Sequence, residues 1–229
     1  MEPHFKAISD HALMVNFAEE ISEDAHAKVV ALDTAIGADM PAGVIETVPA
    51  LVNLLVSFDP METDHIAVEA KVRARLDSMT VQSVAGLERT VQVCYEPPFA
   101  PDLEVVAAAT GQTRDAVINA HLAGDFKVLM YGFAPGYAYL SGVPNLIQVP
   151  RKTKPVRDVP AGSVVIAGPQ CLITTLTMPT GWSIIGRSPT PIFTGNASHP
   201  FLFDVGDRVV FERIDAATLK LLGQGGDHG

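Results

Sequence analysis

A loop rich in glycine, proline and aromatic residues spans residues 132–144, with the sequence Gly-Phe-Ala-Pro-Gly-Tyr-Ala-Tyr-Leu-Ser-Gly-Val-Pro. Its glycines permit positive φ angles and exposed amides, while Phe133, Tyr137 and Tyr139 offer flat walls for a small ligand. A packed barrel loop whose aromatic side chains fill the core explains these residue types equally well. The pattern therefore predicts a substrate-binding loop, with a packed loop as the alternative.

A basic strip follows within an otherwise acidic chain. Arg151, Lys152, Lys154 and Arg157 place four cations in seven positions, and flanking prolines favour an extended backbone. Such a strip could bind an anion or a phosphate group through charge-assisted hydrogen bonds. A solvated charged loop is the alternative, and for a charge run alone it is the more common outcome.

Three further polar or aromatic side chains flank the strands that come next. Gln170 can donate and accept hydrogen bonds, Arg187 can hold a carboxylate with two parallel bonds, and Trp182, the only tryptophan, could form a stacking wall. Together they resemble a recognition set for a small polar amide or acid. A core tryptophan and a surface ion pair for the arginine are the alternatives.

Several catalytic signatures do not occur in this sequence. It has no GxSxG elbow, no P-loop lysine motif, no HExxH and no GxGxxG after a strand. Its two cysteines, Cys94 and Cys171, are too few for a disulfide scaffold or a four-cysteine zinc site, and we expect both to be buried. A complete, self-contained catalytic set is therefore not predicted, and no metal site is expected.

The elements that must position these residues fall into two modules, with a boundary predicted near residues 80–90. The first module has a βαββα pattern, typical of an α+β sandwich. The second is mainly β, with short strands bounded by glycine, proline and aspartate turns, which favours a closed barrel. The expected strands are 12–17, 44–48, 51–58, 90–95, 127–131, 163–167, 171–177, 182–188 and 208–214, and the expected helices are 22–36, 66–79, 102–110 and 113–121.

Charge and hydropathy exclude other classes. The 229 residues carry a net charge of −10, of which −9 lies in residues 1–90, and this argues against a nucleic-acid binder. The longest apolar stretch, residues 49–58, is well below the roughly 20 residues that a membrane-spanning helix needs. The N-terminus has no signal-peptide pattern, so we expect a cytoplasmic protein without a membrane segment.

The motifs together resemble the allophanate hydrolase subunit 1 family (carboxyltransferase domain, subdomains C and D), which includes the B-type subunit of 5-oxoprolinase and Kip-type kinase inhibitors. The resemblance rests on residues 132–140, 150–151, 159–168, 170 and 181–189, supported by 10–13, 48–50 and 55–59. It implies a small α+β domain over residues 1–85 and a cyclophilin-like barrel over residues 86–229. It also implies partners: a subunit 2 protein, the C-type subunit in 5-oxoprolinase, of similar barrel type, and a third lactam-utilisation subunit.

The reaction implied by the resemblance is ATP-dependent opening of the lactam 5-oxoproline to glutamate. ATP would act through the complex, with no metal or biotin expected in this chain. On this hypothesis Gln170 and Arg187 are catalytic and orient the substrate, and Arg151 and Lys152 lie near phosphate. The residues expected to bind substrate are Phe133, Pro135, Gly136, Tyr137 and Trp182.

The hypothesis requires the loop, Gln170 and Arg187 to converge at one mouth of the barrel, completed by a docking partner. Such a split site would explain the incomplete catalytic set, and the chain alone is expected to be inactive. Two alternatives stay open: a regulator that inhibits a sensor histidine kinase through the acidic first module, and a carboxyltransferase component of urea or allophanate metabolism.

Overall fold

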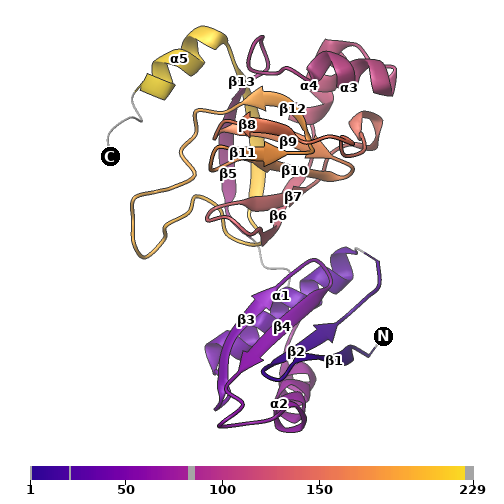
Figure 1. Ribbon diagram of the computed structural model, residues 1–229, viewed down its shortest axis with the longest axis vertical. Helices are drawn as coiled ribbons and strands as arrows, with labels where there is room; N and C mark the ends of the chain where they lie inside the picture. Colours follow the sequence, from indigo (N-terminus) through magenta and orange to yellow (C-terminus); the bar gives the residue numbers. More distant parts are fainter. Residues whose placement is uncertain (1, 21, 82–85, 225–229) are drawn as a thin grey trace. The chain divides into compact units, whose positions relative to one another are not determined.

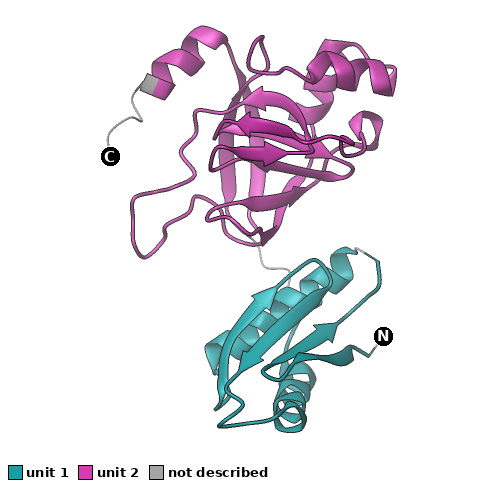
Figure 2. Ribbon diagram, viewed as in Figure 1, with its two compact units in different colours: residues 1–85 teal, residues 86–229 magenta. Residues whose placement is uncertain are grey.

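The computed structural model describes residues 2–20, 22–81 and 86–224. It divides into two compact units, unit 1 (Met1–Ala85) and unit 2 (Gly86–Gly229), coloured separately in Figure 2. The predicted boundary includes residues 82–85, which lie outside the described residues. That the two units fold as independent domains stays a prediction.

Unit 1 is a two-layer α+β structure. Its described elements are β1 (His4–Ser9), β2 (Ala12–Asn16), α1 (Glu23–Ala38), β3 (Val44–Pro49), β4 (Asn53–Phe58) and α2 (His65–Ser78). The antiparallel sheet has the order β1-β2-β4-β3. The hydroxyl of Ser22 accepts the amide of Ala25 at 3.2 Å and the carboxylate of Asp64 accepts the amide of Ala67 at 2.8 Å, so each helix begins at a capping side chain.

The core of unit 1 lies between the helices and one face of the sheet. Leu54, Val56 and Phe58 alternate along β4 toward Val29 of α1 and Val68 of α2. Strand β1 was not predicted from the sequence. It is an edge strand with mostly exposed residues, and it lacks the alternation of buried and polar positions that identifies a strand.

Unit 2 contains the barrel. Its described elements are β5 (Glu88–Cys94), α3 (Leu103–Thr110), α4 (Arg114–Leu122), β6 (Phe126–Tyr131), β7 (Ala138–Ser141), a 3-10 turn (Asn145–Ile147), β8 (Val156–Val159), β9 (Ser163–Ala167), β10 (Gln170–Ile173), β11 (Met178–Thr180), β12 (Ser183–Arg187), β13 (Arg208–Ile214) and α5 (Ala216–Gln224). In this described part, seven strands close in the order β10-β7-β6-β13-β5-β12-β9, which confirms the predicted barrel (Figure 1).

The barrel wall packs against apolar side chains on both of its faces. Val164, Ile166 and Ile185 belong to the main core, which also includes apolar residues of α3 and α4. Val165 and Ile184, the alternate positions on β9 and β12, belong to a second cluster that includes residues of the two-stranded ribbon β8–β11. The wall at β9, β10 and β12 is therefore buried on both faces, and the sequence there is a continuous apolar run.

Among the helices of the described residues, none has both the length and the apolar character that crossing a membrane requires.

Candidate functional site

The predicted catalytic pair lies at opposite ends of one strand. Gln170 pairs with Ala167 at the last position of β9, whereas Arg187 pairs with Ser163 at its first position. Four residues of extended chain correspond to about 13 Å. The expected convergence of Gln170 and Arg187 is therefore wrong, because adjacent strands carry the two residues to different ends of the sheet. We call these the Gln170 end and the Arg187 end.

The predicted loop spans both ends: its residues 138–141 form strand β7, and only its first part, residues 132–137, lies at the Arg187 end. A series of hydrogen bonds crosses the strands there: the Ser188 amide donates to the Gly162 carbonyl at 2.7 Å, and the Gly162 amide donates to the Thr174 carbonyl at 2.6 Å. The hydroxyl of Thr175 then donates to the carbonyl of Pro135 in the loop at 2.9 Å. The first part of the loop and Arg187 thus lie at the same end, whereas the last part of the loop, at Val143, lies near Gln170.

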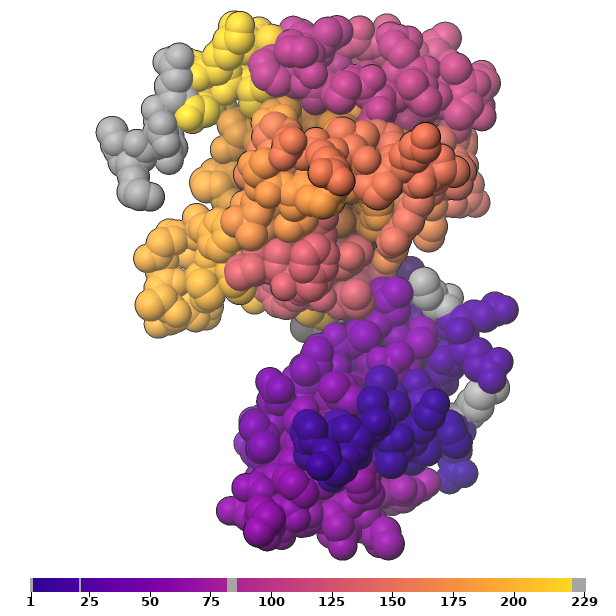
Figure 3. All heavy atoms as spheres, in the orientation of Figure 1, coloured from indigo at the N-terminus to yellow at the C-terminus, as the bar shows by residue number. Residues whose placement is uncertain are grey.

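The tip of the loop packs closely against a distant segment of unit 2. Gly136 has a φ of 67°, and a side chain there would meet Ile192 and Phe201 at 3.1 Å. Both belong to the long segment between β12 and β13, which projects to the left of the barrel in Figures 1 and 3. Phe133 is 82% exposed, so it is the loop aromatic that is available to a ligand.

Tyr137 and Trp182 do not form the open wall that was expected. Each is 5% exposed and belongs to the cluster outside the barrel wall, and the Tyr139 ring lies 5.9 Å from Tyr137 and 5.7 Å from Trp182. Burial raises the pKa of Tyr137 to about 12. These residues match the alternative of a packed loop and a core tryptophan.

Arg187 is half-buried and has no acidic partner among the described residues. Its Nη1 donates to the Ala161 carbonyl at 3.3 Å, while its Nε is enclosed and makes no hydrogen bond. Burial lowers the pKa of this guanidinium, because a desolvated charge is disfavoured. The half-buried guanidinium lines an open cavity and has no carboxylate partner among the described residues, so its outer nitrogens can bind an anion from outside the chain.

The basic strip does not form one anion site. Lys152 Nζ lies 2.5 Å from Asp102 Oδ2, which also accepts the Ile184 amide at 2.6 Å, so this ammonium is engaged inside the fold. The Arg151 guanidinium lies 5.4 Å from the centre of the Trp182 ring, a cation–π contact. The two side chains of the predicted phosphate pair thus have different partners, since adjacent residues of an extended segment point in opposite directions.

Gln170 begins β10 after the turn at Gly168 and Pro169 and is half-buried. The Gly168 amide donates to Val149 at 2.7 Å, and the Pro169 carbonyl accepts the Val143 amide at 3.3 Å. These contacts are made by the backbone of the turn. The Gln170 side chain makes no hydrogen bond within the described residues, and its predicted catalytic role stays a prediction.

A cluster of three buried polar side chains in unit 2 was not predicted from the sequence. The Tyr95 hydroxyl lies 2.8 Å from Nδ1 of His121, and Sγ of Cys171 lies 3.6 Å from Nε2. All three residues have zero exposure, and burial lowers the pKa of His121 to about 3 and raises that of the Cys171 thiol. A protonated, inaccessible thiol is not a nucleophile, so this group is structural. Cys94 is also fully buried, which confirms the expectation for both cysteines.

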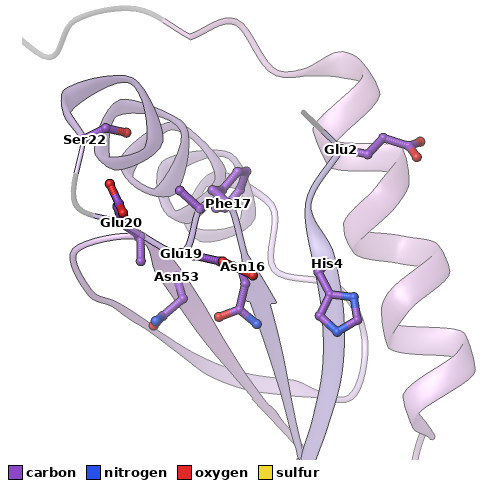
Figure 4. A pocket seen from close by; sticks show the side chains of 10 residues that line it. Glu2, His4, Asn16, Phe17, Glu19, Glu20, Ser22 and Asn53 are labelled. Atoms are coloured by element: carbon purple, nitrogen blue, oxygen red, sulfur yellow. The ribbon is translucent and has the colours of Figure 1, made fainter.

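Unit 1 has a cavity of about 1030 Å³ whose chemistry differs from that of the Arg187 end. Glu2, Glu19 and Glu20 line it together with His4 and other residues near the ends of β1 and β2 (Figure 4). Its acidic side chains would repel an anionic substrate. Within the described part of the chain, no group of three His, Cys, Asp or Glu side chains is placed to hold a metal ion.

Comparison with known proteins gives one family and a relative that matches over nearly its full length. The family model "Carboxyltransferase domain, subdomain C and D" matches residues 3–203. The chain is 36% identical over 219 residues to the B-type subunit of 5-oxoprolinase from Bacillus subtilis (strain 168), covering 90% of this chain and 91% of the relative.

Solved structures with the same fold agree with this family assignment. The crystal structure of TTHA0988 matches with a TM-score of 0.79 and 29% identity over 91% of this chain, which spans 41% of that longer protein. The Kluyveromyces lactis urea amidolyase matches with a TM-score of 0.84 over 98% of this chain and 16% of its own. At 16% identity the second match shows the fold alone.

Proposed function

Because the chain belongs to the carboxyltransferase domain, subdomain C and D, family, we propose that it is the B-type subunit of an ATP-dependent 5-oxoprolinase. The observation that carries this proposal is the 36% identity to a relative of that name across nine-tenths of both chains. The reaction would hydrolyse the lactam bond of 5-oxoproline to release glutamate, coupled to hydrolysis of ATP.

The Arg187 end is the part of the chain that we assign to the substrate. Arg187 offers an unpaired guanidinium, and the loop that carries Phe133, Pro135 and Gly136 adjoins the same edge of the sheet. In this proposal Arg187 holds the carboxylate of the substrate and so orients the lactam ring. Gln170 is about 13 Å away along β9 and cannot contact the same small molecule.

We place the nucleotide on a partner subunit. Lys152 is neutralised by Asp102, Arg151 lies over Trp182, and the sequence contains no P-loop. The residues expected to contact phosphate therefore do not fit that role in this chain, and we derive no step through ATP here. Hydrolysis of an unactivated lactam needs an electrophilic carbonyl, so the partner must supply the activation that the Arg187 end lacks.

The test is reconstitution. The purified chain is combined with homologues of the C-type and third subunits, and glutamate release from 5-oxoproline is measured with and without ATP. We expect turnover that requires ATP, this chain and the partners together, and none from the chain alone. Absence of ATP-dependent glutamate release from the assembled complex would contradict the proposal.

A further inference from the structure

A cavity of about 390 Å³ adjoins Arg187 in unit 2. It is lined by Phe99, Ala161, Arg187, Ser188, Pro189, Leu219, Lys220 and Gly223. Two of these side chains are cationic and none of them is acidic. The volume lies within the range of small-molecule sites, about 300–1,000 Å³.

The two cations have no counter-charge inside the described fold. Among the other half-buried cations described in unit 2, Arg89 contacts Asp207 at 2.7 Å and Lys152 contacts Asp102 at 2.5 Å. Arg114 donates to the Tyr95 carbonyl at 2.7 Å and lies 3.9 Å from Glu104. Arg187 has one hydrogen bond to a carbonyl and an enclosed, unpaired Nε, and exposed Lys220 makes no ion pair with a described residue. In a chain of net charge −10, this local excess of positive charge favours an anionic ligand.

Apolar side chains complete the cavity. Phe99 is half-buried, Leu219 of α5 is 6% exposed, and Pro189 follows the Arg187–Ser188 pair. An aromatic and aliphatic surface beside a guanidinium suits a ligand with a compact apolar ring next to an anionic group, rather than a free inorganic ion.

We propose that this cavity is the carboxylate subsite for the ring-shaped substrate: Arg187 binds the carboxylate, Lys220 adds a second positive charge, and Phe99 and Pro189 contact the ring. The assignment of the ring ligand rests on the proposed function. It adds α5, which carries Lys220 and Leu219, to the binding site.

Ligand-observed NMR titration of the full-length chain tests the subsite directly. The probes are 5-oxoproline, cyclopentanecarboxylate (the ring and carboxylate without the lactam), 2-pyrrolidinone (the lactam without the carboxylate) and inorganic phosphate. We expect both carboxylates to bind and 2-pyrrolidinone to bind at least about tenfold more weakly, as for loss of a hydrogen-bonded charge. Equal binding of 2-pyrrolidinone, tighter binding of phosphate than of the carboxylates, or no binding of either carboxylate would overturn the proposal.

Three variants locate the effect. Arg187→Gln should weaken 5-oxoproline binding by about 10-fold or more, because it removes a charged hydrogen-bond donor. Lys220→Gln should weaken it by about two- to fivefold, as expected for an exposed charge. Lys127→Gln removes an exposed lysine that does not line the cavity and should leave binding unchanged. Equal effects of the Lys127 and Lys220 substitutions would overturn the role of Lys220.

Kinetics of the assembled complex separate this proposal from the proposed function. If the complex releases glutamate and Lys220→Gln raises KM for 5-oxoproline without lowering kcat, both are supported. If the complex turns over and neither the Arg187 nor the Lys220 variant changes KM, the subsite is refuted and the function stands. If the chain binds both carboxylates but the complex has no activity, the function is refuted and the anionic-ring site stands.

Discussion

Strand β12 has a half-buried cation near each of its ends, and the two have opposite surroundings. At its start, the Lys152 ammonium contacts Asp102, whose Oδ2 also accepts the Ile184 amide of the strand. At its end, the Arg187 guanidinium has a carbonyl contact and an enclosed, unpaired Nε. One cation is part of the architecture, and the other is the one that we propose binds a ligand.

This contrast shows how the same residue type can serve stability or function. A charge that is desolvated and paired within the chain holds two segments together, and removing its partner destabilises the fold. A charge that is desolvated without a partner costs free energy in the isolated chain and is compensated when an anion binds. The predictions that follow test whether the two ends differ in this way.

The largest expected change in stability comes from the glycines that flank strand β9, Gly162 at the Arg187 end and Gly168 at the Gln170 end. Gly162, with φ 79°, has its would-be Cβ 2.5 Å from the Ser188 carbonyl oxygen, whereas Gly168, with φ 52°, has no atom within 4 Å of that position. We expect Gly162→Ala to lower the free energy of unfolding by about 3 kcal/mol or more, through clash and strain, and Gly168→Ala by about 1 kcal/mol. Urea unfolding measures both, and equal losses would show that the Arg187 end is no more tightly constrained.

The paired cation is tested by Asp102→Asn. The amide keeps the shape and an acceptor for the Ile184 amide but removes the charge opposite Lys152. We expect a loss of about 2 kcal/mol in the free energy of unfolding, below the cost of breaking a fully buried pair because both side chains are partly exposed. Asp125→Asn, which breaks the exposed pair with Arg208, is the control and should cost under about 0.5 kcal/mol. Similar losses of stability in the two variants would mean that the Asp102–Lys152 pair contributes no more than an ordinary surface ion pair.

Acid titration tests whether the barrel interior, rather than its ends, governs pH sensitivity. His121 has a pKa of about 3 when folded, against 6.5 for the exposed imidazole, so between these values the unfolded chain binds a proton that the folded chain does not. Stability from this group is complete above pH 6.5 and falls as the pH is lowered, by about 2 kcal/mol at pH 5.

The variant His121→Phe separates this effect from the other ionisable groups. Its ring would lie against Phe126 and Phe211, whose centroids are 4.9 and 4.5 Å from that of His121. We expect a lower stability at pH 7, because Tyr95 loses its partner, but a smaller change between pH 7 and pH 5 than in the parent chain. An unchanged difference in the urea midpoints at the two pH values would exclude His121 as the source.

Local patterns in the sequence predict most of the barrel. The apolar runs that became β9, β10 and β12 are buried on both faces, so they stand out as strands whatever lies around them. Edge strand β1 and the short ribbon strands β8 and β11 carry mixed or exposed residues and lack that signal. Barrel strand β7 was also missed, because its residues 138–141 fall within the segment interpreted as a loop. Helix α5 was also missed, and with it Lys220.

The candidate site was less predictable, because it depends on register and pairing. Gln170 follows the turn at Gly168 and Arg187 ends strand β12, and nothing in their spacing shows that they lie at opposite ends of β9. Whether a cation is free or neutralised depends on a carboxylate distant in the sequence: Asp102 is 50 residues from Lys152. Motifs locate residue types, whereas the partners of those residues come from topology.

The smallest expected effect is also the sharpest test of the comparison between the two ends. If no group in the chain offsets the desolvation cost of the Arg187 charge, Arg187→Gln removes that cost. It should then leave the free energy of unfolding unchanged or raise it by up to about 1 kcal/mol. Arg89→Gln is the matched control: it removes a guanidinium paired with Asp207, which is 2% exposed, and should cost about 2 kcal/mol. A loss for the Arg187 variant as large as that for Arg89 would mean that Arg187 supports the fold, as Lys152 does. A neutral or stabilising result would mean that the desolvated charge at this end contributes nothing to folding, as we expect of a group that serves a ligand.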